Sequence, residues 1–369
     1  MSRRVWQVAA GDPGRFYTTL FRDHDIMFIG PGDPGEFDDA VYRREVERGL
    51  LTLNKMGGLK SFRFGPKPDD LVFMREAHKV IALGLIPDEA RPEHGYLWDD
   101  TFDDVHGWDL QHTRRVIWQE QLEGDIRQLQ ANSKLLFKDR KSIPSFTSVS
   151  DSKVLNPISH LFDKCKVRPL RKRPPPIPKP LELDELGAEL FSKGLPNESV
   201  DKVLVAIQRQ RRMARWYAEC GRKTHRPTEH EVVAHMVLPL MLALGWSEQL
   251  LAVEWHKIDL AVFCATPTTE ETCPLICEAK VIGHGLQDTY GQAKKYTERL
   301  RLTACNKIML TDGIRIYLYE RGDTEWPDSA SGYFNVKKIR TNHIAPGDTN
   351  AVDTLMALTP SRVLRPLIK

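Results

Sequence analysis

Residues 274–282 read PLICEAKVI, an almost continuous apolar run of the kind that forms a strand buried on both faces of a sheet. Two charged side chains, Glu278 and Lys280, interrupt the run. Because alternate residues of a strand point to the same side, these two share one face. Burying a carboxylate and an ammonium group is costly unless each is paired or binds a metal. The stretch therefore predicts a central strand that carries a functional pair.

The segments around this strand alternate between helical and extended patterns. Residues 229–244 have helical spacing, with Thr228 as the N-cap and Gly245 as the residue that ends the helix. Alternation of this kind predicts an α/β domain over residues 226–325. The other predicted elements are strands within 250–264, at 307–311 and at 314–320, and a helix at 287–302.

A second carboxylate, Asp259, lies in the strand predicted beside the central one. Two close carboxylates repel each other unless one is protonated or a cation lies between them. A hard divalent cation, Mg²⁺ or alternatively Mn²⁺, prefers such oxygen ligands. We therefore predict that Asp259 and Glu278 bind a metal ion, while Lys280 orients a water molecule or stabilises developing charge. Gln292 and Tyr296, four residues apart on the next helix, share a face that can support this site.

The order of these residues resembles the PD-(D/E)xK nuclease superfamily, and most closely the nuclease domain of type I restriction-enzyme motor subunits. The resemblance covers residues 226–320, about a quarter of the chain. One departure is Ile258, which stands where the superfamily name has proline. The matching features are Asp259, the motif Glu278-Ala279-Lys280, the pair Gln292 and Tyr296, and a glutamate helix that runs from Glu229 through Pro239 to Leu244-Gly245-Trp246.

The resemblance implies a three-layer α/β core of element order αβββαβ and Mg²⁺-dependent hydrolysis of phosphodiesters. It also implies a homodimer, because many such enzymes cut both DNA strands as dimers. For the auxiliary acidic residue, Glu231 is an alternative to Glu229, since the two point to different sides of the helix. The implied site residues are the metal ligands Asp259 and Glu278, the catalytic Lys280, the auxiliary Glu229, and the supporting Gln292 and Tyr296.

Basic residues concentrate in the middle of the chain, over residues 121–225. Residues 164–180 read KCKVRPLRKRPPPIPKP, and their prolines favour an extended conformation, so residues 121–185 are expected to form a basic, semi-rigid connector. Residues 186–225 are expected to be a basic helical segment in which Met213 and Trp216 are buried. The arginines expected on its exposed face, as DNA contacts, are Arg209, Arg211, Arg212 and Arg215.

Residues 1–120 alternate short apolar runs with turn signals, which predicts a small β-rich domain, a barrel, with its likeliest helix at 43–53. The order of its strands resembles the PUA-like superfamily, which includes the EVE and YTH readers of modified bases. That resemblance implies a DNA-reading or sensor domain with an aromatic-lined pocket for a base. Buried core tryptophans are the simpler alternative. The residues expected in the pocket are Trp98, Trp108, Asp109 and His112.

Composition excludes some classes of protein. The 369 residues include 53 Lys and Arg, 50 Asp and Glu, 41% apolar residues and 6 cysteines, which is typical of a soluble globular chain with reduced thiols. No apolar run approaches the roughly 18–20 residues that a membrane span needs, so a cytoplasmic location is expected. Residues 326–369 are expected to be a C-terminal extension.

We therefore expect a DNA endonuclease of the restriction or phage-defence type, whose partners are DNA, a second copy and possible further defence subunits. One alternative is an inactive nuclease fold that binds DNA or assembles a complex. Another is a nuclease gated by a small nucleotide ligand.

Overall fold

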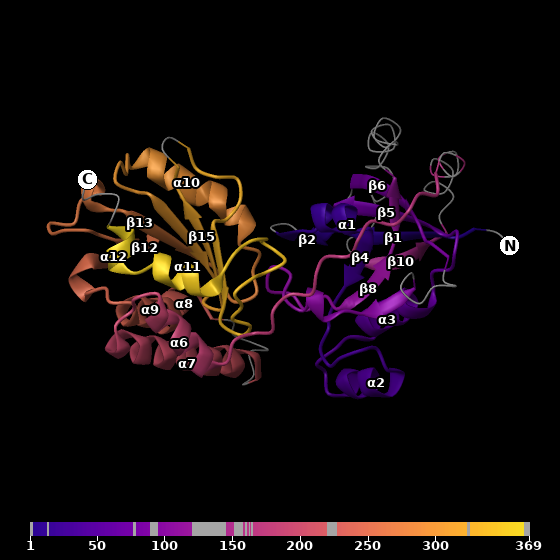
Figure 1. The fold of residues 1–369 in the computed structure, drawn as a ribbon, viewed down its shortest axis with the longest axis horizontal. Helices are drawn as coiled ribbons and strands as arrows, with labels where there is room; N and C mark the ends of the chain where they lie inside the picture. Colours follow the sequence, from indigo (N-terminus) through magenta and orange to yellow (C-terminus); the bar gives the residue numbers. More distant parts are fainter. Residues whose placement is uncertain are drawn as a thin grey trace. The chain divides into compact units, whose positions relative to one another are not determined.

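The computed structural model describes residues 3–12, 15–76, 79–88, 95–119, 145–150, 165–219, 227–322 and 325–364, with the single residues 158, 161 and 163. The chain divides into two compact units, residues 1–176 and 177–369 (Figure 1). The five predicted segments are thus replaced by two units, because the described parts of the predicted connector, helical segment and extension each pack into one of them.

In the N-terminal unit the described strands form open sheets flanked by helices (Figure 1). A five-stranded sheet has the order β10-β1-β5-β6-β9, and a three-stranded sheet has the order β4-β8-β7. No ring of strands closes among the residues described, so the predicted barrel is not confirmed. The strands are β1 (Val5–Ala9), β2 (Gly11–Asp12), β3 (Arg15–Phe16), β4 (Ile26–Ile29), β5 (Leu71–Glu76), β6 (Lys79–Leu85), β7 (Tyr96–Trp98), β8 (His112–Arg115), β9 (Ile117–Gln119) and β10 (Phe146–Val149).

The helices of this unit are α1 (Thr18–His24), α2 (Asp39–Glu47) and α3 (Leu53–Phe64). The single helix predicted at 43–53 is wrong, because two separate caps divide the region. The side chain of Asp38 accepts a hydrogen bond from the backbone N–H of Val41 and begins α2. Thr52 does the same for Lys55 and begins α3.

The basic part of the predicted connector is also different from the expectation. Residues 165–173 are not a free spacer but fold against the N-terminal unit. The buried carboxylate of Asp25 accepts hydrogen bonds from the Arg168 guanidinium and from the backbone N–H of Arg171. These hydrogen bonds to the Asp25 carboxylate hold the segment against the unit, although its prolines favour an extended backbone.

The C-terminal unit is built on one six-stranded sheet of order β11-β12-β13-β14-β15-β16. Only the pairing of β13 with β14 is parallel. The strands are β11 (Leu251–Trp255), β12 (Ile258–Val262), β13 (Leu275–Ala279), β14 (Lys307–Thr311), β15 (Arg315–Glu320) and β16 (Gly332–Asn335). The helices are α6 (Leu183–Ser192), α7 (Asn197–Glu219), α8 (Glu229–Val232), α9 (Leu238–Ala243), α10 (Tyr290–Arg299), α11 (Ala351–Ala357) and α12 (Pro360–Val363).

Helices cover both faces of this sheet (Figure 1). Leu260, Cys277 and Met309 belong to the core shared with α6, α7, α9 and α11. Ile276 and Leu310 belong to the core on the opposite face, which α10 closes. The chain is therefore α/β, as predicted, and the order helix, three strands, helix, strand is present. That this is a restriction-endonuclease core stays a prediction.

The helix predicted at 229–244 is present but interrupted. Between α8 and α9, residues Val233–Val237 form a π-helical turn, in which Leu238 N–H bonds to Val233 O. Pro239 explains the interruption, because it lacks an N–H and its ring would clash with the carbonyl four residues earlier. Thr228 caps α8, as predicted, and Gly245 follows α9 with a positive φ of 103°.

Helix α7 exposes one long face. Val203 and Ile207 are buried, but Trp216 is 48% exposed, so its predicted burial is wrong. Its neighbour Tyr217 is the aromatic that points into the core instead. In the part of the chain that is described, no helix is both long and apolar enough to cross a bilayer.

Candidate active site

The two predicted metal ligands lie on neighbouring strands. β12 and β13 pair antiparallel with Leu260 opposite Cys277, so one further step along the register brings Asp259 opposite Glu278. Side chains that face each other in this way are roughly 5 Å apart at Cβ. Asp259 is fixed in place because its Oδ2 accepts a hydrogen bond of 2.6 Å from the backbone N–H of Ala279.

Lys280 points inward, between two glutamates. Its Nζ lies 2.9 Å from Glu278 Oε1 and 3.2 Å from Glu229 Oε1, and its side chain is only 14% exposed. The alternative residue Glu231 does not reach this place, because its carboxylate accepts a bond from the backbone N–H of Thr228 in the capping box of α8. Of the two glutamates of α8, Glu229 is therefore the one at the site.

The residues predicted on α10 complete the cluster. Gln292 Nε2 donates to Glu278 Oε1 at 2.8 Å and to the hydroxyl of Tyr296 at 3.0 Å. The guanidinium of Arg299 lies 4.9 Å above the ring of Tyr296. Hydrogen bonds and ion pairs thus join five of the six predicted residues, Glu229, Glu278, Lys280, Gln292 and Tyr296, in one network. Asp259 lies opposite Glu278 on the neighbouring strand, and the chemical roles of all six stay predictions.

Burial sets the electrostatics of the network. The Glu278 carboxyl is 3% exposed, and burial raises its pKa to about 7 although Lys280 opposes the shift. Burial likewise raises the pKa of Asp259, and the hydrogen bond from Ala279 opposes this. Burial alone would lower the pKa of Lys280, but the hydrogen bond to Glu278 and the nearby carboxylates raise it above its usual value. The lysine is therefore charged and the glutamate is proton-sensitive near neutral pH.

The second carboxylate oxygen of Glu278 is the informative atom. Oε2 is buried and has no hydrogen-bond partner among the described residues. A buried oxygen without a partner costs free energy, and a bound cation or water satisfies it. Within the described ranges no group of three or more His, Cys, Asp or Glu is arranged to hold a metal ion. Two carboxylates still suit Mg²⁺, which keeps several waters and binds through one or two carboxylates plus substrate phosphate.

Sequence reasoning missed Glu254. The pairs Val253–Leu260 and Trp255–Ile258 place it opposite Asp259 on the other side of β12. Its φ is +58°, its Oε1 lies 3.0 Å from Nδ1 of His230, and its charge contributes to the raised pKa of Asp259. The sequence held a signal for this residue. Side chains alternate between the two faces of a strand, so the short hairpin of β11 and β12 places Glu254 and Asp259 on one face.

A buried ion pair supports the loop after Lys280. The Asp312 carboxylate accepts bonds from the Arg315 guanidinium at 2.6 Å and from the backbone N–H of Gly283 at 3.0 Å. Arg315 also donates to the carbonyl of His284 at 2.7 Å. The sequence did not indicate this ion pair as a support of the loop, because Gly283 and His284 lie about 30 residues away from it in the chain.

The predicted DNA-binding arginines of α7 differ in exposure. Arg209, Arg212 and Arg215 are exposed. Arg211 is half-buried and its Nε donates to the carbonyl of Val336 at 2.7 Å. Arg211 therefore anchors α7 to the sheet, which corrects its expected place on the exposed face with the other three.

The predicted base pocket is contradicted at His112, which is completely buried. Its Nε2 lies 3.0 Å from both Pro31 O and the Tyr42 hydroxyl, and its Nδ1 lies 2.7 Å from the Tyr96 hydroxyl. Pro31 O can only accept, so Nε2 carries the proton and Nδ1 accepts from Tyr96. Burial lowers the pKa of His112 to about 4. Both nitrogens are satisfied by the protein, and neither remains for a base.

The other pocket residues do not gather around His112 as a group. Trp98 pairs with His112 across β7 and β8, and the two rings meet edge to face at 5.1 Å. The indole N–H of Trp98 donates to Asp100 at 2.9 Å. Trp108 forms an isolated bridge with Val105 in the preceding loop. The carbonyl of Asp109 accepts a bond from the N–H of Gly32 at 2.9 Å, in the turn after β4.

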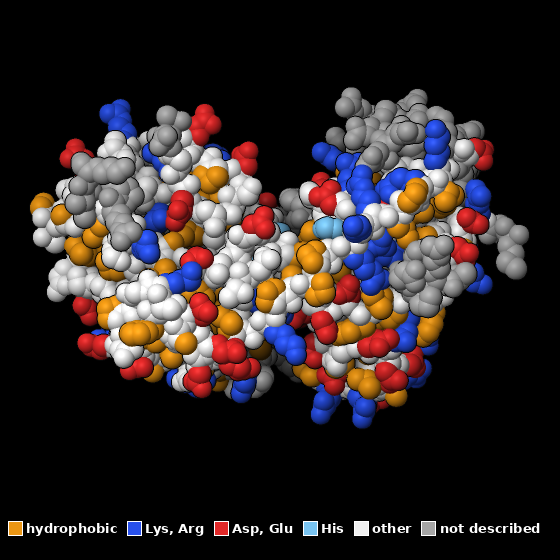
Figure 2. All heavy atoms as spheres, in the orientation of Figure 1, with side chains coloured by type: hydrophobic (Ala, Val, Ile, Leu, Met, Phe, Trp, Pro, Cys, Tyr) orange, Lys and Arg blue, Asp and Glu red, His pale blue; other side chains and the backbone are white. Residues whose placement is uncertain are grey.

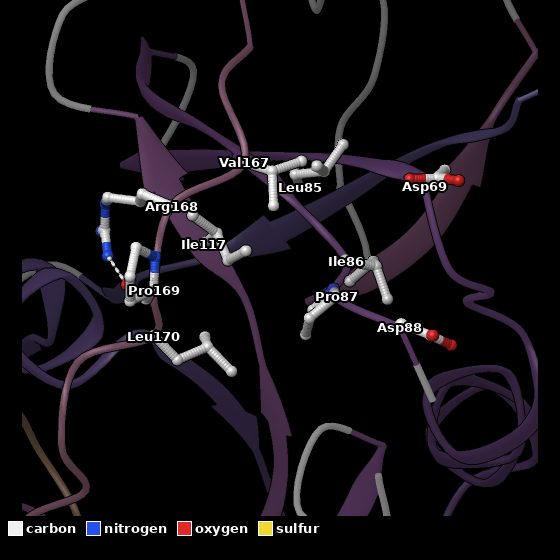
Figure 3. Close-up of a pocket in the computed structure, with 10 residues that line it drawn as sticks. All are labelled: Asp69, Leu85, Ile86, Pro87, Asp88, Ile117, Val167, Arg168, Pro169 and Leu170. Atoms are coloured by element: carbon white, nitrogen blue, oxygen red, sulfur yellow. Dashed lines mark hydrogen bonds between the residues drawn. The ribbon is translucent and has the colours of Figure 1, made fainter. Parts of the chain in front are cut away.

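A cavity of about 730 Å³ lies elsewhere in this unit (Figure 3). Its lining among the described residues includes none of the four predicted pocket residues and no aromatic side chain, so these residues do not provide the stacking surface expected of a base reader. Its lining residues are Asp69, Leu85, Ile86, Pro87, Asp88, Ile117, Val167, Arg168, Pro169 and Leu170.

Comparisons of this chain with models of protein families, with curated proteins and with solved structures found no match.

Proposed function

We propose that this chain is a metal-dependent DNA endonuclease of the restriction or phage-defence type. The observation that carries the proposal is the carboxylate of Glu278. One oxygen is held by Lys280 and Gln292, whereas the other is buried without a partner among the described residues. Other buried polar atoms, such as Gln210 Oε1 and Asn306 Oδ1, also have no partner among the described residues, but the Glu278 oxygen lies beside a second carboxylate, Asp259. Buried polar groups are as a rule hydrogen-bonded, so we infer that a ligand completes this one. The resemblance to PD-(D/E)xK nucleases supports a metal ion as that ligand.

Asp259 and Glu278 would hold Mg²⁺ or Mn²⁺. Asp259 Oδ2 is bound to the backbone of Ala279, which leaves Oδ1 for the ion, and Glu278 offers Oε2. When bound, the ion supplies positive charge that holds the scissile phosphate and makes a nearby water more acidic. Oxygen-only ligands of this kind fit a hard cation better than zinc.

The remaining residues position charge around this point. Lys280 is held charged between Glu229 and Glu278, so it can donate to the phosphate or orient the attacking water. Gln292 fixes the orientation of the Glu278 carboxylate, and Tyr296 fixes the amide of Gln292. Their precise placement matters because a displacement of 1 Å can cost about 100-fold in rate.

The rest of the chain is proposed to bind DNA. The exposed arginines Arg209, Arg212 and Arg215 of α7 suit phosphate contacts, and the N-terminal unit is proposed to recognise DNA, modified or unmodified. A homodimer and further defence subunits are proposed from the resemblance alone. Sedimentation of the full chain with and without DNA tests the dimer.

The direct test is incubation of the full chain with modified and unmodified phage DNA, with and without Mg²⁺ or Mn²⁺. Cleavage by the wild type, its loss in Asp259→Ala and Lys280→Ala, and retained DNA binding by both variants support the proposal. Glu248→Ala, which removes an exposed carboxylate, is the matched control and should cut like the wild type. Equal cleavage by all four proteins contradicts the proposal. DNA binding without product at any divalent ion supports an inactive binding module instead.

A further inference from the structure

The basic segment of residues 165–173 is held in one shape against the N-terminal unit. Asp25, which is completely buried, accepts two hydrogen bonds from the Arg168 guanidinium, at 2.6 and 2.8 Å. It accepts a third from the backbone N–H of Arg171 at 2.8 Å. A bidentate pair of this kind fixes direction as well as position. Asp25 therefore acts as a clamp on the middle of the segment.

A second clamp holds the beginning of the segment. The side-chain amide of Gln119 accepts from the backbone N–H of Lys166 at 2.9 Å and donates to its carbonyl at 3.1 Å. Both contacts use the backbone of Lys166, so its charged side chain is exposed. Further along, the carbonyl of Arg171 accepts from the buried guanidinium of Arg115. Hydrogen bonds to the backbone of Lys166 and Arg171 and to the guanidinium of Arg168 thus hold the segment in place, while Lys166 and Lys172 are exposed to solvent.

The surface made in this way is strongly positive. Figure 2 shows Lys and Arg side chains gathered on this face of the N-terminal unit. Asp25 is buried and paired with Arg168, Asp99 lies 4.0 Å from Arg173 at the end of the segment, and Asp69 and Asp88 line the same cavity as Arg168. We define the basic band by its members, which are Arg22, Lys166, Arg168, Arg171, Lys172 and Arg173.

We infer that the basic band binds the sugar–phosphate backbone of DNA. The inference deepens the proposed function, because it names the surface with which the N-terminal unit holds its substrate. A segment that is already fixed does not have to be ordered when it binds phosphates, whereas a flexible linker would. Less conformational entropy is therefore lost on binding. Phosphate contacts fix register on the duplex and carry no sequence information, so this surface is separate from any base reader.

The first test is binding of a fluorescent 30-base-pair duplex by the full chain, measured by anisotropy in EDTA over a range of salt concentrations. Lys166→Glu/Lys172→Glu should weaken binding at least about tenfold and lower the slope of log affinity against log salt by about 2. The matched control is Lys55→Glu/Lys67→Glu, which changes the net charge equally at exposed residues of the same unit outside the band. It should change the affinity less than about threefold.

Asp25→Asn separates the shape of the band from its charge. The variant removes one negative charge and also weakens the clamp on Arg168 and Arg171. If net charge alone mattered, DNA affinity would rise. We expect it to fall about three- to tenfold, with faster hydrogen exchange over residues 165–173. Gln119→Ala, which loosens the segment without changing any charge, should lower the affinity in the same direction, and thermal unfolding checks that both variants fold.

Three results would overturn the inference. The band variant and the control could bind DNA equally, Asp25→Asn and Gln119→Ala could both bind as tightly as the wild type, or the band variant could lose binding to anionic lipid vesicles but not to DNA. Cleavage is measured separately, so the two proposals are distinguishable. If the wild type binds DNA through the basic band but does not cut it, only the proposed endonuclease activity is refuted. If the band variant cuts DNA and binds it as tightly as the wild type does, only the proposed role of the band is refuted.

Discussion

Two buried polar clusters, one in each unit, look alike in the sequence and differ in the structure. In the cluster around His112, both ring nitrogens of that histidine have a partner, and burial lowers its pKa so that the ring stays neutral. Around Glu278, one oxygen has no partner among the residues described, and the pKa is raised to about 7. Three further carboxylates, Glu229, Glu254 and Asp259, contribute negative charge there against the single ammonium of Lys280.

The difference teaches how to tell a site from a core. A satisfied polar network stabilises one conformation and needs nothing from outside the protein. An unsatisfied network with excess charge of one sign favours a ligand of the opposite sign or the uptake of a proton. By this comparison the C-terminal cluster is the candidate for a functional site, and the His112 cluster is part of the folded core.

The largest effect is expected for Glu278→Gln, which keeps the shape of the side chain and removes its charge. We expect cleavage to fall at least about 1000-fold, because a neutral amide binds a divalent cation much more weakly than a carboxylate does. The measurement is product formed per minute at saturating Mg²⁺, with DNA binding measured in parallel. Substantial residual cleavage would show that Glu278 is not a metal ligand.

His112→Ala is the matched change in the other cluster. The substitution leaves a cavity. It also removes the hydrogen bond of Nδ1 with Tyr96 and the contacts of Nε2 with Tyr42 and Pro31. We expect the free energy of unfolding to fall by about 3–5 kcal/mol. Cleavage per folded molecule should stay within about threefold of the wild type at low temperature. Urea unfolding and cleavage activity, measured on one preparation, check both expectations. If the variant kept its stability but no longer recognised DNA, the His112 cluster would be a functional site and not part of the core.

The pH dependence of stability sharpens the comparison. The Glu278 carboxyl ionises near 4.5 in the unfolded chain and near 7 in the folded protein. Between these values the folded state binds more protons, so the stability that this group contributes is present below pH 4.5 and is lost as the pH rises through 7. Without divalent metal, the loss should be about 3 kcal/mol. Urea unfolding in EDTA from pH 4 to 8 measures it.

Glu278→Gln provides the control for that titration. The variant lacks the ionising group, so this part of the pH dependence should disappear, and at pH 8 without metal it should be more stable than the wild type. An unchanged pH profile in the variant would mean that some other group causes the loss.

The smallest effect is expected for Glu254→Gln. The residue lies opposite Asp259 but is half-exposed and faces His230, so solvent screens its charge. We expect cleavage at saturating Mg²⁺ to change less than about tenfold and the Mg²⁺ concentration for half-maximal activity to rise. A loss as large as that of Glu278→Gln would make Glu254 a direct metal ligand.

The periodicity of strands and helices predicted the contacts within this cluster, because each pair lies within or directly beside one regular element. Strand alternation placed Glu278 beside Lys280, helix periodicity placed Gln292 beside Tyr296, and the structure has both contacts. The strand at 307–311 is confirmed in full, and the strand at 314–320 begins one residue later. Local periodicity was enough because each pair lies within one element.

Features that depend on distant partners could not be predicted in this way. The docking of residues 165–173 depends on Asp25, more than 140 residues earlier, and His112 was misjudged because its partners come from three other segments. Trp216 was expected in the core, yet the helix turns Tyr217 inward instead. A period of 3.6 does not decide between two adjacent aromatics at the edge of an apolar face.

The central claim is that Asp259 and Glu278 share a divalent cation, and a crystal structure of the protein with Mn²⁺ tests it most directly. We expect one anomalous peak about 2.1 Å from Glu278 Oε2 and from an oxygen of Asp259, with waters completing the octahedron. The same soak of Glu278→Gln should show no peak there. Wild-type crystals in which Mn²⁺ is absent from this place, or in which an ordinary water alone satisfies Oε2, would contradict the claim.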